Sequence, residues 1–159
     1  MTTRTTIALL AALALSLGAC GDEDQPAAAD ATVSVEEVDG VGAVLVDRSG
    51  AALYTADQEA DGTIRCRGEC ARIWLPLEAS GAPTASDDVP GELATVERPD
   101  GAMQVTHDGK PLYRFAEDSE PGDVTGDGLR DRFGDTSFTW HAVTTEGEST
   151  GGSGRGYGY

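Results

Sequence analysis

The 159-residue sequence has few basic side chains and no apolar segment long enough to cross a membrane. Its 11 Lys and Arg residues stand against 28 Asp and Glu residues, which gives a formal net charge of −17. That balance argues against a nucleic-acid partner, because phosphate backbones are bound by clustered cations. The longest apolar run, residues 7–17, is shorter than the roughly 20 residues of a membrane-spanning helix. At about 150 residues per domain, the length allows one folded domain.

The N-terminus has the pattern of an export signal. Arg4 supplies a basic leader, residues 7–17 have the length of a signal-peptide apolar region, and small residues follow. Residues 17–20, Leu-Gly-Ala-Cys, resemble the lipobox of bacterial lipoproteins, in which the cysteine is diacylated and becomes the first residue of the mature chain. The resemblance implies that residues 1–19 are removed and that acyl chains such as palmitate on Cys20 anchor the protein to the bacterial cell membrane. An ordinary secretory signal with a chance cysteine is the alternative.

Two segments have compositions typical of linkers and loose ends. Residues 20–32, which include the lipidated cysteine, are acidic and hold one proline, so they predict an extended tether. Residues 146–159 hold 6 glycines and no apolar periodicity, which predicts a disordered tail. The folded domain is therefore expected over residues 33–145. Because this body is acidic, anionic head groups would repel it, and lipid rather than charge would hold it at the membrane.

The pattern of this domain is that of short antiparallel strands. No segment of ten or more residues shows helical spacing, and the best candidate is one turn over residues 70–74, stopped by Pro76. We predict a mainly β fold with little helix, a small sandwich or open barrel of about seven strands. The expected strands are residues 44–46 returning as 51–56, residues 93–97 returning as 102–107 and then 111–116, and a final strand over 138–144.

The strands form two pseudo-repeats. The segment Gly-Ala-Ala-Leu-Tyr at residues 50–54 aligns with Gly-Lys-Pro-Leu-Tyr at residues 109–113, and each copy continues through acids to a tryptophan. The first copy spans about 41–77 and the second about 102–143. Each copy is too small to bury its own apolar face, so the two are expected to share one core.

Two signatures in these copies resemble a known family. Residues 113–118, Tyr-Arg-Phe-Ala-Glu-Asp, match the Tyr-x-aromatic-x-x-Asp motif of bacterial lipoproteins built from the "secreted repeat of unknown function". Residues 66–76 are similar to the family's Cys-x-Gly-x-Cys-Ala-x-x-Trp-x-Pro segment. The resemblance covers about residues 41–143 and implies an extracytoplasmic lipoprotein with no established activity. It singles out Tyr54, Trp74, Tyr113, Phe115, Asp118 and Trp140.

The first copy departs from this motif at two positions. Ala56 stands where the motif has an aromatic residue, and Glu59 stands where it has Asp. A pocket built by the motif would therefore be incomplete in the first copy.

Cys66 and Cys70 remain as a pair once Cys20 is assigned to lipid. Export places them in an oxidising compartment, which favours a disulfide. The alternative is a copper-binding or redox site, because two thiolates at this spacing suit Cu(I). Its further ligands would be Met103, His107 or His141. The spacing of the cysteines and histidines does not match a structural zinc site.

The loop 123–131 resembles a calcium loop in part. Acids at its positions 1, 5 and 9 and a glycine at position 6 follow that pattern. Position 12 is Gly134 in place of a bidentate carboxylate, and no helix is expected on either side. Glycine turns of the family repeat account for the same residues, so both interpretations stay open.

The remaining candidates favour structural roles. Tyr113, Phe115 and Trp140 have the alternation of core side chains, and Asp118 has the position of a turn former. His107 lies at a hairpin tip, where a solvated turn is expected. The sequence holds no nucleophile elbow, phosphate loop or Ser-His-Asp set. We therefore expect a non-catalytic, lipid-anchored extracytoplasmic protein that serves as a binding or cell-surface structural module without a cofactor. A copper-binding or redox lipoprotein is the alternative.

Overall fold

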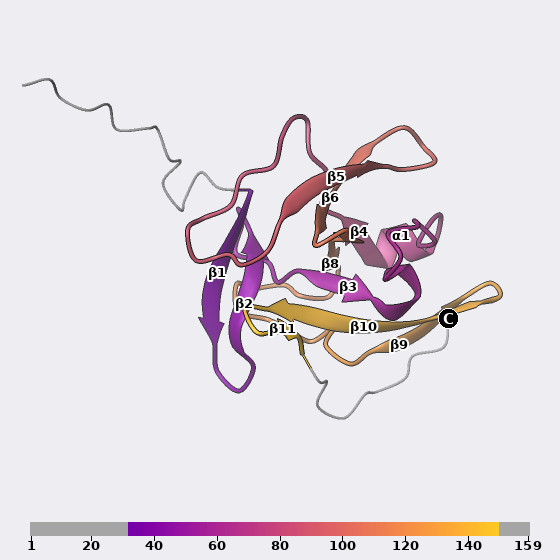
Figure 1. The fold of residues 1–159 in the computed structure, drawn as a ribbon. Coiled ribbons are helices and arrows are strands. Elements are labelled where there is room, and N and C mark those ends of the chain that lie inside the picture. The colour runs from indigo at the N-terminus through magenta and orange to yellow at the C-terminus, as the bar shows by residue number, and fades with distance from the viewer. Residues whose placement is uncertain (1–31, 150–159) are drawn as a thin grey trace, which may run out of the picture.

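The computed structural model of the protein describes residues 32–149. The predicted signal peptide, Cys20, the tether up to residue 31 and the tail from residue 150 lie outside these residues, so their assignments stay predictions. The predicted fold class is confirmed, because strands dominate and the helical parts of the described residues are α1 (Cys70–Ile73) and one 3-10 turn (Asp57–Glu59) (Figure 1). Within 32–149, no helix has the length and apolarity to cross a bilayer.

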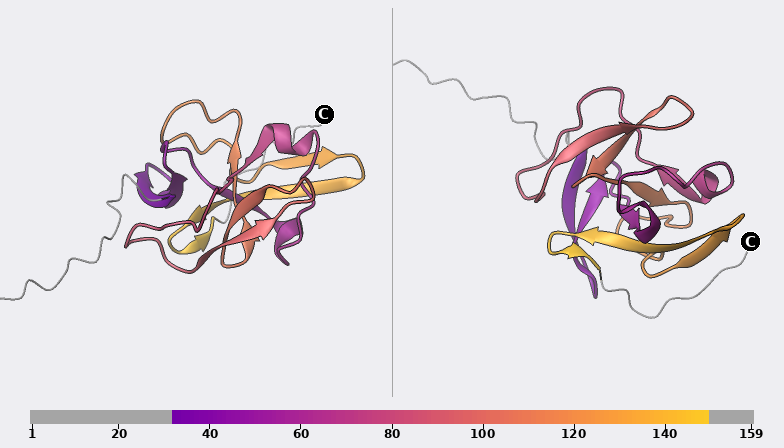
Figure 2. Two further views of the ribbon diagram at one scale, coloured as in Figure 1. Left: turned by 90° about the horizontal axis from the view of Figure 1, so that it is seen from above. Right: turned by 45° about the vertical axis from the view of Figure 1, so that its right-hand side comes forward.

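Within residues 32–149, the strands form two antiparallel sheets. The larger has eight strands in the order β1-β2-β10-β3-β8-β4, with β9 and β11 also paired to β10, and the smaller has the order β5-β6-β7. The strands are β1 (Val33–Val38), β2 (Gly42–Asp47), β3 (Tyr54–Ala56), β4 (Trp74–Pro76), β5 (Leu93–Glu97), β6 (Met103–His107), β7 (Lys110–Pro111), β8 (Tyr113–Phe115), β9 (Arg130–Phe133), β10 (Thr136–Thr144) and β11 (Gly147–Glu148). Seen from two further sides, β1 and β2 lie at one end of the molecule, and α1 lies with the β9–β10 hairpin at the other (Figure 2).

Two cores lie on opposite faces of the larger sheet. Neighbouring residues of a strand point to opposite faces, so Val44 belongs to one cluster and Leu45 to the other. The first cluster is rich in aromatic rings. The second is aliphatic and unites Leu45 of β2, Val105 of β6 and Val143 of β10, which joins the two sheets. This layering makes the fold a small sandwich.

The predicted hairpins are confirmed where the turn decides the pairing. β5 and β6 pair from Leu93 opposite His107 to Glu97 opposite Met103, and Gly101 in their turn has a φ of +88°. The expected third strand, residues 111–116, is wrong as one unit. β7 continues the small sheet, whereas β8 pairs with β3 and β4 of the large one. The chain changes sheets at Leu112, which lies in the aliphatic core.

The first predicted hairpin is correct only at its turn. Val46 opposes Ala52 in a single bridge, but β2 pairs along its length with β1, and β3 leaves to pair with β10 and β8. The prediction missed β1 because its central residues, Glu36 and Glu37, are exposed acids that interrupt the apolar alternation.

The final strand is confirmed over residues 138–144 and begins two residues earlier. Its partner β9 was expected to be loop, although Arg130 opposes Thr139 and Phe133 opposes Thr136 in a hairpin. Charged residues fill most of β9, which hides its strand pattern. Phe138, Trp140 and Ala142 are buried, as the alternation predicts.

Candidate functional site

The aromatic residues of the motif form a stacked group in the first core. Trp74 and Trp140, one from each copy, lie nearly parallel with ring centroids 3.9 Å apart. Phe115 stacks on Trp74 at 4.5 Å, and Tyr113 meets Trp140 edge-on at 5.2 Å. Each of these four rings is at most 4% exposed. The group therefore fills the space between the copies and presents little surface to a ligand.

The tyrosines and acids of the two copies are cross-connected. The Tyr54 hydroxyl donates a hydrogen bond to the Asp118 carboxylate at 2.6 Å, and the Tyr113 hydroxyl donates one to the Glu59 carboxylate at 2.6 Å. Each acid lies five residues after the tyrosine of its own copy but accepts from the tyrosine of the other. Antiparallel pairing of β3 with β8 places Tyr54 opposite Tyr113, so the two hydroxyls can reach across in this way.

The same acids hold the loops that follow them. Glu59 accepts hydrogen bonds from the backbone N–H groups of Arg65 and Cys66, the latter at 2.6 Å. Asp118 accepts from the N–H of Thr125 at 3.0 Å and from its hydroxyl at 2.6 Å. Cys66 and Thr125 each lie seven residues after the acid. Glu59 thus does in the first copy what Asp118 does in the second, and its departure from the motif leaves the arrangement complete.

Burial controls the protonation of these groups. It raises the pKa of the phenols of Tyr54 and Tyr113 far above their ordinary value, and the neighbouring carboxylates raise it further. Both phenols therefore remain hydrogen-bond donors. Burial also raises the pKa of Asp118, against the opposing effect of its bonds from Thr125 and Tyr54. Asp118 is thus a turn former, as expected, and also an acceptor for a distant side chain that the sequence did not indicate.

A second buried polar group connects the small sheet with the cysteine loop. Arg98 is 3% exposed and donates to the Gln104 side-chain oxygen at 2.5 Å and to the Cys66 carbonyl at 3.1 Å. Gln104 in turn donates to the Leu112 carbonyl at 2.7 Å. Sequence reasoning missed this group, because Arg98 stands beside a turn where an exposed charge is the usual expectation.

Cys66 and Cys70 form a disulfide. The other proposed copper ligands make separate contacts. The His107 Nε2 lies 2.6 Å from the Pro90 carbonyl, and the His141 Nδ1 lies 3.1 Å from the Ser149 carbonyl. Met103 is 39% exposed. In the part of the chain that the structure describes, no three His, Cys, Asp or Glu side chains gather as metal ligands would.

His107 corrects one expectation. It is 7% exposed, although its hairpin tip predicted a solvated side chain. The loop before β5 folds over the tip, because Asp108 accepts a hydrogen bond from the Glu92 N–H at 2.9 Å. The Pro90 carbonyl is thereby placed against the imidazole.

The acids of loop 123–131 are turned toward three different partners. Asp123 accepts backbone bonds from Ser119 and Glu120, at 3.0 and 2.9 Å. Asp127 accepts from the Ala142 N–H, and Asp131 accepts from the Trp74 indole N–H at 2.7 Å. These bonds fasten the loop to β10 and to the aromatic group, and the three carboxylates do not converge on one point.

Comparison with known proteins bears on the second copy. Residues 94–144 match the family described as a secreted repeat of unknown function. This segment of the chain is similar to that repeat. The matched segment runs from β5 to the end of β10, so it contains Tyr113, Phe115, Asp118 and Trp140. A secreted repeat implies an extracytoplasmic location. No curated protein and no solved structure matches the chain.

Proposed function

We propose that this protein is a lipid-anchored extracytoplasmic module without catalytic activity, whose folded body binds a ligand. The observation that carries the proposal is the mutual pairing of the motif side chains. Tyr113 and Glu59 are each 0% exposed, and the Tyr113 hydroxyl donates a hydrogen bond to the Glu59 carboxylate within the core. A catalytic acid, base or nucleophile must come within hydrogen-bond reach of its substrate, and these groups are closed off from one. The burial and pairing of the motif side chains therefore support a structural role for the motif. Binding of a ligand would then take place at the surface of the folded body.

The anchor is supported by the lipobox-like residues before Cys20 and by the secreted character of the family. Two acyl chains bind a bilayer stably, whereas a single chain exchanges with solvent. An acyl anchor on a tether of about a dozen residues would hold the acidic body near the membrane without requiring attraction to head groups.

The anchor is tested by the intact mass of the mature protein recovered from the membrane fraction of a bacterial host. We expect an N-terminal Cys20 that carries diacylglycerol, and a Cys20→Ser variant that lacks the acyl mass and leaves the membrane fraction. A wild-type mature protein without acyl mass, recovered from the soluble extracytoplasmic fraction, would show an ordinary secretory signal instead.

A further inference from the structure

A hollow opens between α1 and the turn that joins β9 to β10. Its volume is about 340 Å³, the size of a small organic ligand. α1 and β9 are distant in sequence but lie at the same end of the molecule (Figure 1). The residues that line the hollow are Glu69, Arg72, Ile73, Arg132, Phe133 and Gly134.

Two arginines line this hollow, one from each of the elements that border it. Arg72 comes from α1 and Arg132 from β9, and both residues are exposed. Arg132 donates from Nε to the Gly134 carbonyl at 3.2 Å, which holds its side chain beside the turn and leaves its terminal nitrogens to other partners. Across residues 32–149, neither guanidinium forms an ion pair with a carboxylate. A planar guanidinium fork matches the two oxygens of a carboxylate.

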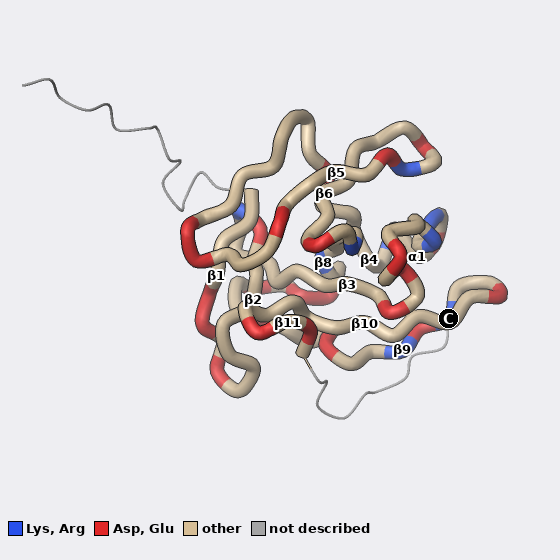
Figure 3. Tube along the Cα trace, viewed as in Figure 1, with Lys and Arg blue, Asp and Glu red and all other residues tan. Residues whose placement is uncertain are grey.

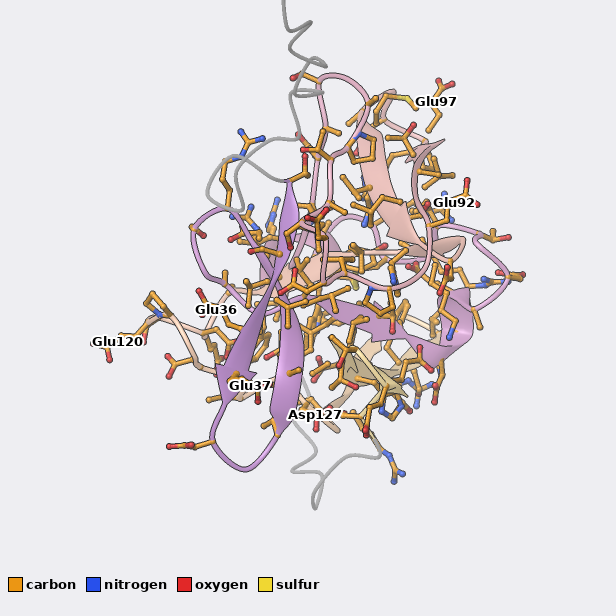
Figure 4. All side chains as sticks on the ribbon, turned by 60° about the vertical axis from the view of Figure 1, so that its left-hand side comes forward. Glu36, Glu37, Glu92, Glu97, Glu120 and Asp127 are labelled. Carbon is orange, nitrogen blue, oxygen red and sulfur yellow. A yellow bond between two sulfur atoms is a disulfide. The ribbon has the colours of Figure 1, made fainter. Side chains whose placement is uncertain are left out.

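The charge around the hollow departs from that of the whole protein. Although the chain is strongly acidic, the hollow is lined by two arginines and one acid, and basic positions lie near α1 and β9 (Figure 3). The opposite flank presents acids, among them Glu36, Glu37 and Glu120 (Figure 4). The two arginines would therefore attract an anion to the hollow.

The remaining lining residues limit what kind of anion fits. Ile73 and Phe133 are half-buried and give the hollow an apolar wall. Glu69 is exposed at its edge and would repel a second negative charge. We infer that this hollow binds a small organic monocarboxylate, with its carboxylate between Arg72 and Arg132 and its apolar body against Ile73 and Phe133.

This inference deepens the binding role proposed above by naming the class of ligand. It is tested on the Cys20→Ser protein by titration with 3-phenylpropionate, followed by backbone amide NMR. We expect saturable shifts at Arg72, Ile73, Phe133 and Gly134, with a dissociation constant on the order of 1 mM for a ligand of this size. The alcohol 3-phenylpropanol and the amine 3-phenylpropylamine share its apolar body and should bind at least about tenfold more weakly.

Three substitutions sharpen the test. Arg72→Gln and Arg132→Gln should each weaken binding about tenfold, whereas Glu69→Gln should strengthen it about twofold. Arg67→Gln, which removes the same charge from an exposed residue outside the hollow, is the matched control and should keep the wild-type affinity.

The inference is overturned if the carboxylate causes no saturable shifts at the hollow, or if the alcohol binds as well as the carboxylate. Equal losses in Arg67→Gln and Arg72→Gln would likewise contradict it, since they would show net charge rather than a site. Lipidation is measured by mass in a separate experiment, so failure here would leave the anchor standing.

Discussion

Tyr113 and Glu59 form a hydrogen bond in the core, where neither residue has exposed surface. This bond depends on a single atom, the hydroxyl oxygen of Tyr113. Tyr113→Phe removes the hydroxyl and leaves a buried carboxylate oxygen without that donor. We expect the free energy of unfolding to fall by about 2 kcal/mol, the usual cost when a buried charged acceptor loses its partner. Urea denaturation of the two proteins measures this difference.

Tyr54→Phe is the matched comparison in the other copy. Its acceptor Asp118 is only half-buried and can replace the lost bond with water, so we expect a loss of about 1 kcal/mol. A Tyr113→Phe protein as stable as wild type would contradict the structural role of the motif.

Asp118 and Asp123 lie in one acidic segment but should titrate in opposite directions. Burial raises the pKa of Asp118 above its ordinary value of 3.8, whereas backbone N–H donors, first that of Glu120 and then that of Ser119, lower the pKa of Asp123. Because folded protein holds the Asp118 proton more tightly than unfolded protein, its contribution to stability is full below 3.8 and is lost as pH rises through the raised pKa.

Carbon-detected NMR of the side-chain carboxyls measures both pKa values directly. Asp118→Asn should remove the decline in unfolding free energy that accompanies the Asp118 titration. An Asp118 that titrates at or below 3.8 would show that the bonds from Tyr54 and Thr125 outweigh its burial.

Among the secondary elements, the short loop closed by Cys66 and Cys70 connects α1 with two buried polar residues. The Cys66 backbone N–H is bound by Glu59 and its carbonyl by Arg98. Folded Cys20→Ser protein should therefore contain no free thiol by mass-spectrometric counting under non-reducing conditions. A Cys66→Ala/Cys70→Ala variant should lose about 2 kcal/mol of stability, as expected for so short a loop. Two free thiols in the folded protein would contradict the disulfide and favour the copper hypothesis.

The elements that sequence predicted are those fixed by neighbouring residues. The β5–β6 hairpin follows from its Pro-Asp-Gly turn, and α1 follows from a short run stopped by Pro76. Strand β9 and the division between β7 and β8 depend on partners far along the chain, so local pattern could not show them. The Tyr113–Glu59 bond belongs to this second kind, because it exists only once β8 has paired with β3.

Across the whole molecule, the matching motif residues of the two copies contact one another. Paired tryptophans and crossed tyrosine–carboxylate bonds occupy the faces that each copy would otherwise expose. The surfaces that remain accessible for binding a ligand are those that lie on one copy alone or between the two copies. The hollow between α1 of the first copy and β9 of the second exists only when both copies are packed together. Sequence reasoning could not find it, because Arg72 and Arg132 are 60 positions apart.

The most direct measurement compares stability and 3-phenylpropionate binding in the same two variants. Tyr113→Phe should lose about 2 kcal/mol of unfolding free energy while its folded form binds with wild-type affinity. Arg72→Gln should unfold within about 0.5 kcal/mol of wild type while its affinity falls about tenfold. This crossed result would assign stability to the motif and recognition to the hollow. Loss of binding in folded Tyr113→Phe, with affinity retained in Arg72→Gln, would contradict the account.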